Sequence, residues 1–150
     1  MEVTKPLGYL LSRSMRMFKN QVAAEFKSRG IELSFEQYVI LHMINSQCDL
    51  IQQDLANYLQ KDKSIIVRQI DSLIEKEYLV RQPNLEDKRK KNILLTEKGL
   101  VAMNEMTQMA IEVSNRLLHG VSDEEFATFK LVLNKIQENG EKTESNLNNQ

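Results

Sequence analysis

Residues 51–99 read IQQDLANYLQKDKSIIVRQIDSLIEKEYLVRQPNLEDKRKKNILLTEKG. Apolar residues recur at helical spacing in the first ten positions and predict a helix over 51–60. After a short break that ends in Asp62, an acid suited to capping, the same spacing predicts a second helix over 63–79. The second helix keeps a polar and partly basic face away from its apolar side. Two helices joined in this way form a helix-turn-helix, a pattern typical of DNA-binding proteins.

A hairpin with a basic tip follows the second helix. Short strands are predicted over 79–82 and 92–95, with turn-forming residues at 83–86 between them. The tip, 87–91, is Asp-Lys-Arg-Lys-Lys. A cluster of cations cannot pack in a core, so these side chains face water or a polyanion. A hairpin in this place is a wing, and residues 34–96 are predicted to form a winged helix-turn-helix.

Amphipathic helices flank this unit on both sides. Each has an apolar stripe beside charged residues. Three are predicted, over residues 6–29, 97–119 and 122–139. Together with the winged helix they make one mainly α-helical domain over 1–140, and the polar tail 141–150 is expected to be disordered.

Local signals mark where some of these helices begin and end. Ser34 with Gln37, and Ser122 with Glu125, have the spacing of capping boxes. Gly30 stands where a helix-ending residue in the left-handed region is expected.

Composition limits the class of protein. The chain has 150 residues, a net charge of −1 and one cysteine, Cys48, which excludes an intramolecular disulfide and a cysteine-based zinc site. The neutral total hides a segregated distribution, because residues 61–98 hold ten Lys or Arg against seven Asp or Glu. No apolar stretch is long enough for a membrane span and no signal peptide is evident, so the chain is expected to work in the cytoplasm.

The chain resembles the multiple-antibiotic-resistance regulator (MarR) family of winged-helix transcription regulators. The resemblance rests on Asp87-x-Arg89 followed by Leu95-Thr96-x-x-Gly99, and on the segment from Asp62 to Leu73, and it extends over 6–137. It implies a dimer that binds a pseudo-palindromic operator, most often as a repressor. It also implies that repression is relieved by a small aromatic or phenolic ligand, which binds between the dimerisation helices and the winged helix.

The second helix of the pair is the expected recognition helix in the major groove. Arg68 has the two donors that guanine O6 and N7 accept, and Ile65 and Val67 are suited to thymine methyl groups. The outward residues of this helix that we expect to contact DNA are Lys63, Ser64, Ile65, Val67 and Arg68.

In the wing, Arg89 is the expected minor-groove residue, and Asp87 is placed to hold its guanidinium. Neighbouring lysines and the start of the first helix of the pair are expected to meet phosphates. These are Lys88, Lys90, Lys91, Gln52 and Gln53.

The flanking helices carry more apolar surface than one small winged helix covers, which favours packing across a two-fold axis. The apolar residues expected at the dimer interface are Leu7, Leu11, Met15, Met106, Val113, Leu117, Phe126, Phe129 and Leu133. The methionines near Met106 could also line an adaptable pocket, although core packing is the more common role.

Other interpretations stay open. Cys48 could sense oxidants, although relatives that do so carry the cysteine near the start of the first helix. The winged helix could serve protein contacts alone. No metal-ligand cluster, phosphate loop or nucleophile beside a base is present, so neither enzyme activity nor a cofactor is expected. The chain departs from the family at Glu77, where a glycine is usual, so the entry into the wing could be shifted.

Overall fold

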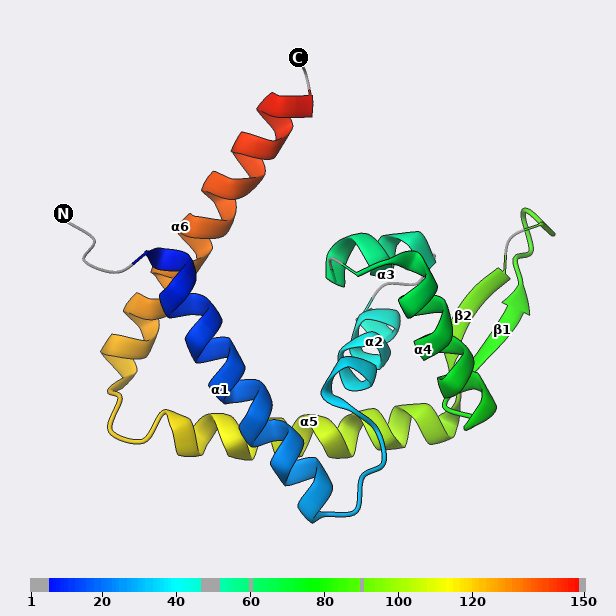
Figure 1. Ribbon diagram of the computed structural model, residues 1–150, viewed down its shortest axis with the longest axis horizontal. Helices are drawn as coiled ribbons and strands as arrows, with labels where there is room; N and C mark the ends of the chain where they lie inside the picture. Colours follow the sequence, from blue (N-terminus) through cyan, green and yellow to red (C-terminus); the bar gives the residue numbers. More distant parts are fainter. Residues whose placement is uncertain (1–5, 47–51, 60, 90, 149–150) are drawn as a thin grey trace. The chain divides into compact units, whose positions relative to one another are not determined.

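The computed structural model describes residues 6–46, 52–59, 61–89 and 91–148 (Figure 1). It is mainly α-helical, with one two-stranded sheet in the described part, as predicted. The chain divides into two compact units, residues 1–114 and 115–150. The elements are α1 (Leu7–Ser28), α2 (Phe35–Ser46), α3 (Gln52–Leu59), α4 (Lys63–Glu75), β1 (Leu79–Pro83), β2 (Lys91–Leu95), α5 (Glu97–Leu117) and α6 (Asp123–Asn148).

The first unit is built around one hydrophobic core that draws on every one of its helices and on both strands. The periodic apolar positions of the sequence supply it, because each helix turns one stripe inward. The methionines of α5 belong to this core, so core packing, the more common of the two roles expected for them, is confirmed. Its largest buried side chains are Val22, Phe26, Ile40, Leu41, Leu55, Ile66, Ile70, Leu73, Leu79, Met106 and Val113.

An ion-pair cluster joins the end of α1 to α5. Arg29, the C-cap of α1, pairs with Glu25 at 2.8 Å and with Glu112 of α5. Hydrogen bonds to these carboxylates, that of Glu112 first, raise the pKa of the Arg29 guanidinium.

The predicted capping boxes are present. The Ser34 amide donates to Gln37 Oε1 and the Gln37 amide donates to Ser34 Oγ, both at 3.1 Å. The same reciprocal bonds join Ser122 and Glu125 at 2.8 and 3.2 Å. Gly30 has a φ of +74°, as expected of the residue that ends α1.

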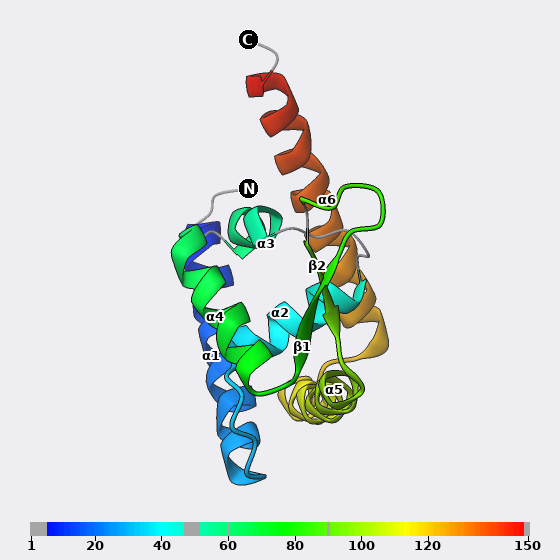
Figure 2. The ribbon, with the colours of Figure 1, turned by 90° about the vertical axis from the view of Figure 1, so that its right-hand side faces the viewer.

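The wing is an antiparallel hairpin that stands beside α4 (Figure 2). Its register pairs Leu79 with Leu95 at the root and Pro83 with Lys91 near the tip. Leu79 and Ile93 are buried, so the root of the hairpin is held by the core while its outer part is exposed.

The prediction that the recognition helix extends to residue 79 is wrong, because α4 ends at Glu75. Glu77 lies in the left-handed region with a φ of 63°. The Tyr78 amide donates to the Leu73 carbonyl at 2.8 Å, and the Glu77 amide donates to the Ile74 carbonyl at 2.9 Å. These are the two bonds of a Schellman motif, which frees the chain to enter β1. Glu77 thus takes the conformation that the family usually assigns to glycine.

The start of α5 is fastened to the end of α4. Thr96 Oγ1 donates to the Glu77 carbonyl at 2.6 Å, and the Thr96 amide donates to the Tyr78 carbonyl at 3.1 Å. The Gly99 amide in turn donates to Thr96 Oγ1 at 3.0 Å. A Cβ on Gly99 would lie 2.0 Å from the Tyr78 carbonyl oxygen, so no larger residue fits. This contact explains the spacing of threonine and glycine in Leu95-Thr96-x-x-Gly99.

The second unit contains the last turn of α5 and the whole of α6. The predictions that the last helix ends near Gly140 and that 141–150 is disordered are wrong for the described residues, because α6 runs to Asn148. Gly140 keeps a helical φ, and the Thr143 hydroxyl donates to the Asn139 carbonyl at 2.8 Å. Glutamate and lysine around them favour a helix, which outweighs the cost of one glycine. No side chain between residues 115 and 145 is fully buried.

Among the residues that the structure describes, no helix is long and apolar enough to cross a membrane.

Candidate nucleic-acid interface

Helix α4 presents a polar face opposite its buried side. Ile66, Ile70 and Leu73 pack into the core, while Ser64 and Arg68 are exposed one turn apart. Lys63, Ser64 and Arg68 are therefore placed on the surface, as the sequence predicted.

The N-terminus of α4 begins at Asp62 without the expected side-chain cap. Its carboxylate makes no capping hydrogen bond, and its backbone carbonyl accepts from the Ile65 and Ile66 amides at 2.9 and 3.2 Å. The expected side-chain cap at the start of α4 is therefore absent.

The two apolar candidates on α4 lie at the edges of the polar face rather than at its centre. Ile65 is 36% exposed and borders a pocket, and Val67 is half-buried. Each retains some surface for a methyl contact, but less than an outward position would give.

The tip of the wing is ordered by two side chains. Asp87 Oδ1 accepts from the Arg89 amide at 3.0 Å and from Arg89 Nε at 3.2 Å. Arg89 is held in this way although its side chain is 91% exposed. Lys88 and Lys91 are also exposed. The predicted pairing of the aspartate with the arginine is therefore present, with the guanidinium facing solvent.

Asn84 fixes the preceding turn and was not among the predicted site residues. Its Oδ1 accepts from the Glu86 and Asp87 amides at 2.8 and 3.0 Å, and its Nδ2 donates to Asn92 Oδ1 at 3.1 Å. An asparagine that bonds to the backbone two residues later is a common turn former. Its position after Pro83 was the sequence signal.

Arg81 is a second residue that the sequence did not single out. Its Nη2 lies 2.6 Å from Asp71 Oδ1, so β1 of the wing is joined to α4 by an ion pair. The alternation of β1 places Arg81 on the same face as buried Leu79, which is the signal that could have located it.

Some candidates lie outside what the structure describes. Lys90 and Cys48 fall in segments that it leaves out, and the side chains of Gln52 and Gln53 are likewise not described, although α3 begins at Gln52.

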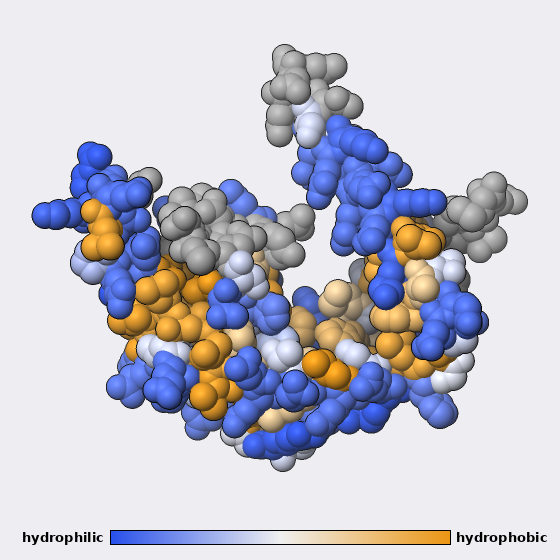
Figure 3. Space-filling view, turned by 180° about the vertical axis from the view of Figure 1, so that it is seen from behind, coloured by the Kyte–Doolittle hydropathy of each residue, from blue (hydrophilic) through white to orange (hydrophobic). Residues whose placement is uncertain are grey.

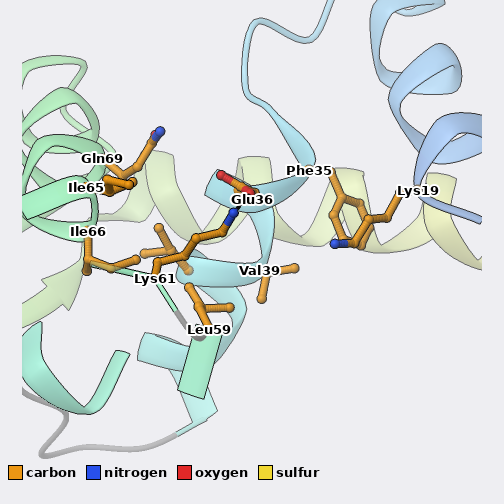
Figure 4. Close-up of a pocket in the computed structure, with 10 residues that line it drawn as sticks. Lys19, Phe35, Glu36, Val39, Leu59, Lys61, Ile65, Ile66 and Gln69 are labelled. Carbon is orange, nitrogen blue, oxygen red and sulfur yellow. Dashed lines mark ion pairs between the residues drawn. The ribbon is translucent and has the colours of Figure 1, made fainter. Parts of the chain in front are cut away.

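A pocket borders α4 and is lined by side chains that come from α1 to α4 and from the turn before α4 (Figure 4). Its cavity volume is about 70 Å³, which is smaller than the roughly 300–1,000 Å³ of drug-sized ligand sites, and it is partly open to solvent. Lys61 Nζ lies 3.3 Å from Glu36 Oε1 at its edge, and Lys19 Nζ lies 5.7 Å from the centre of the Phe35 ring. The full lining is Lys19, Phe35, Glu36, Val39, Ile40, Leu59, Lys61, Ile65, Ile66 and Gln69.

The expected dimer residues fall into two groups. Met106 and Val113 are fully buried in the core of their own chain, so neither has surface to offer a partner. The others are exposed or half-buried: Leu7, Leu11, Met15, Leu117, Phe126, Phe129 and Leu133. Apolar residues reach the surface in patches, as one face of the molecule shows in Figure 3.

Comparison with protein families finds the MarR family over residues 33–91, the stretch that contains α4 and most of the wing. Wild-type MarR from E. coli in its apo form has 23% identity and a TM-score of 0.78, covering 90% of this chain and 98% of that one. A MarR transcriptional regulator from Methanosarcina mazei Go1 has 26% identity and a TM-score of 0.78, covering 91% and 97%. CouR from Rhodococcus jostii RHA1, solved with p-coumaroyl-CoA, has 26% identity and a TM-score of 0.74, covering 91% and 94%.

Proposed function

We propose that this chain, a winged-helix protein of the MarR family, binds a pseudo-palindromic operator as a homodimer and represses transcription. Regulation through DNA binding is the function of the family, and the surface formed by α4 and the wing has the chemistry that it requires. Repression follows where the bound dimer blocks access of the polymerase.

In this proposal α4 enters the major groove. Arg68 donates to guanine, and each such pair contributes about 1–3 kcal/mol of discrimination against a wrong base. Lys63 and Ser64 meet the backbone at the groove edge, and the exposed parts of Ile65 and Val67 contact thymine methyl groups.

The wing follows the adjacent minor groove. Arg89 enters it where an A·T-rich sequence narrows the groove and concentrates negative potential. Lys88, Lys90 and Lys91 neutralise phosphates, which contributes affinity without reading sequence. Gln52 and Gln53 approach a phosphate at the start of α3.

The observation that carries the proposal is the Asp87–Arg89 arrangement. A solvent-facing arginine normally loses its rotamer freedom only on binding, and that loss weakens affinity. Here the hydrogen bond from Nε to Asp87 Oδ1 already restrains the side chain of Arg89 in the free protein, and the bond from its amide fixes the backbone beside it. The arrangement therefore suits a guanidinium that enters a groove.

The test is Arg89→Ala on a duplex selected by the wild-type protein from a random-sequence pool. We expect affinity to fall at least about tenfold, since each dimer loses two arginines. Lys135→Ala, which removes an exposed cation of α6, is the matched control and should bind as the wild type does. Sedimentation should show that the variant keeps its oligomeric state.

Unchanged affinity in Arg89→Ala would contradict the role of the wing. Wild-type affinity should also fall steeply with salt concentration, because several phosphates release counterions on binding. A flat salt response would favour a winged helix that contacts proteins alone.

Dimerisation through the exposed apolar residues of α1, α5 and α6 would place two reading surfaces on one duplex. Half-site centres one helical turn apart, about 34–36 Å, or a multiple of it, are then required. A footprint of the selected duplex gives this spacing directly.

The remaining part of the proposal is that a small ligand relieves repression. The pocket beside α4 has an apolar floor and two lysines near its edge, which suits a small aromatic or phenolic anion. A ligand can lower operator affinity if it binds more tightly to a dimer whose recognition helices are wrongly spaced for the operator. The loss of operator affinity is then set by how much more tightly the ligand binds that dimer than the DNA-binding one. The relative CouR was solved with a phenolic thioester.

A further inference from the structure

The recognition helix and the wing are joined by one ion pair on their outer side. Asp71 lies on the same exposed face of α4 as Ser64 and Arg68, opposite the buried residues. Its carboxylate receives Arg81 Nη2 at 2.6 Å, and the side chains are 53% and 32% exposed. The pair therefore lies at the surface that we assign to DNA, between the helix and the hairpin.

The hairpin needs such a tie because its apolar anchorage ends early. Leu79 and Ile93 are buried at its root, and Ile93 is the cross-strand partner of Arg81. Beyond Arg81, Gln82 and Pro83 are exposed. Arg81 is thus where the wing passes from the core to solvent.

We propose that the Asp71–Arg81 pair sets the angle between α4 and the wing, so that Arg68 and Arg89 reach neighbouring grooves of one duplex together. This inference rests on the proposed DNA-binding function and adds a positioning role for two residues that it did not include.

A positioning role fits the charges better than a phosphate contact does. The carboxylate of Asp71 neutralises the guanidinium of Arg81, so the pair as a whole attracts no phosphate. A charge-assisted bond of this length is directional and fixes the relative orientation of its partners. Arg89 differs, because its side chain is 91% exposed and reaches solvent at the tip.

The size of the effect follows from exposure. Exposed ion pairs stabilise weakly, but a two-fold dimer contains two of them and loses both in a variant. Each single substitution should therefore lower operator affinity by about fivefold.

The experiment is a double-mutant cycle with Asp71→Asn, Arg81→Gln and the double variant, on the duplex selected by the wild-type protein. Both single variants should lose affinity equally, and the double variant should lose no more than either. The dependence of affinity on salt should keep the wild-type slope. Gln82→Ala, on the opposite face of β1, is the matched control and should leave affinity unchanged.

Several outcomes overturn the proposal. A loss in Arg81→Gln alone, with a salt slope smaller by about one per protomer, would make Arg81 a phosphate contact. A gain in Asp71→Asn would make Asp71 only a repulsive charge. No change in either variant would make the pair an incidental surface bridge. Failure to select any duplex with the wild type would instead count against the proposed function.

Amide hydrogen exchange tests the same tie without DNA. Asp71→Asn and Arg81→Gln should each speed the exchange of amides in β1 and β2 near the tip, by the same factor, and leave α6 unchanged. Equal exchange in wild type and variants would overturn the positioning role whether or not DNA is bound.

Discussion

At the scale of single residues, Glu77 adopts a strained backbone conformation at a position where the fold requires a turn. A side chain in the left-handed region costs about 1–2 kcal/mol relative to the right-handed one. The hydrogen bonds of the Schellman motif and the Thr96 hydroxyl hold it there. The chain therefore enters the wing through the same turn that a glycine would allow, because Glu77 itself adopts the left-handed conformation. The shift in this entry that the sequence left open does not occur.

Replacing Glu77 with glycine should therefore stabilise the protein. We expect Glu77→Gly to raise the free energy of unfolding by about 0.5–1 kcal/mol, the relieved strain less the added freedom of the unfolded chain. Urea unfolding followed by circular dichroism at fixed protein concentration measures it. Glu75→Gly, at a helical position two residues earlier, is the control and should destabilise by about 1 kcal/mol. Destabilisation of similar size in both variants would show that residue 77 carries no strain.

Single-residue features were predictable where their partners are close in sequence. The capping boxes and the hold of Asp87 on Arg89 follow from spacings of two or three residues. The Asp71–Arg81 pair was not predicted, because it depends on how the hairpin leans on the helix. That orientation comes from packing in three dimensions.

At the scale of elements, apolar spacing, a capping box at Ser34 and turn residues together indicated the helices and strands of the described part, and errors occurred at ends. The recognition helix was predicted too long, because the residues up to Leu79 continue its apolar pattern while the backbone already turns at Glu77. The last helix was predicted too short, because Gly140 resembles a stop signal, although its neighbours favour helix. Apolar spacing reports burial, and it reports the path of the backbone only indirectly.

The pocket is an element-scale feature that no spacing could reveal, since residues from α1 to α4 line it. We expect it to bind 4-fluorobenzoate, a small aromatic carboxylate, with a shift and broadening of its ¹⁹F resonance. The neutral 4-fluorobenzyl alcohol should bind at least about fivefold more weakly, because it lacks the charge that a lysine attracts.

A pocket-filling variant decides whether the probe binds there. Val39→Phe should lose the ¹⁹F effect while it keeps operator binding, since Val39 lies on α2 and is not among the expected DNA contacts. Equal probe binding by Val39→Phe and wild type would place the ligand elsewhere.

At the scale of the whole molecule, the net charge of −1 does not by itself favour the proposed binding to DNA. The distribution is informative, because four of the five residues 87–91 at the wing tip are cations. The structure has two compact units, and no side chain between residues 115 and 145 is fully buried. The apolar spacing of α6 predicts that one side of the helix is covered, but it does not identify the surface that covers it.

We expect Phe129 to lie in the dimer interface. Its side chain is 51% exposed in the single chain, and Phe129→Glu would place a charge twice in a two-fold contact. The dimer dissociation constant should rise by at least about thirtyfold, as for a central interface residue. Sedimentation equilibrium measures it. Leu131→Glu, an exposed leucine on the opposite side of α6, should remain dimeric, and monomers in both variants or in neither would contradict this assignment.

Helix α5 begins against the carbonyls of Glu77 and Tyr78, in the turn that joins α4 to β1. Because Gly99 has no side chain and no larger residue fits there, the start of α5 packs directly against this turn. A substitution that shifts the start of α5 would consequently move the turn that follows α4. Under the proposed function, such a substitution would lower operator affinity without touching the duplex.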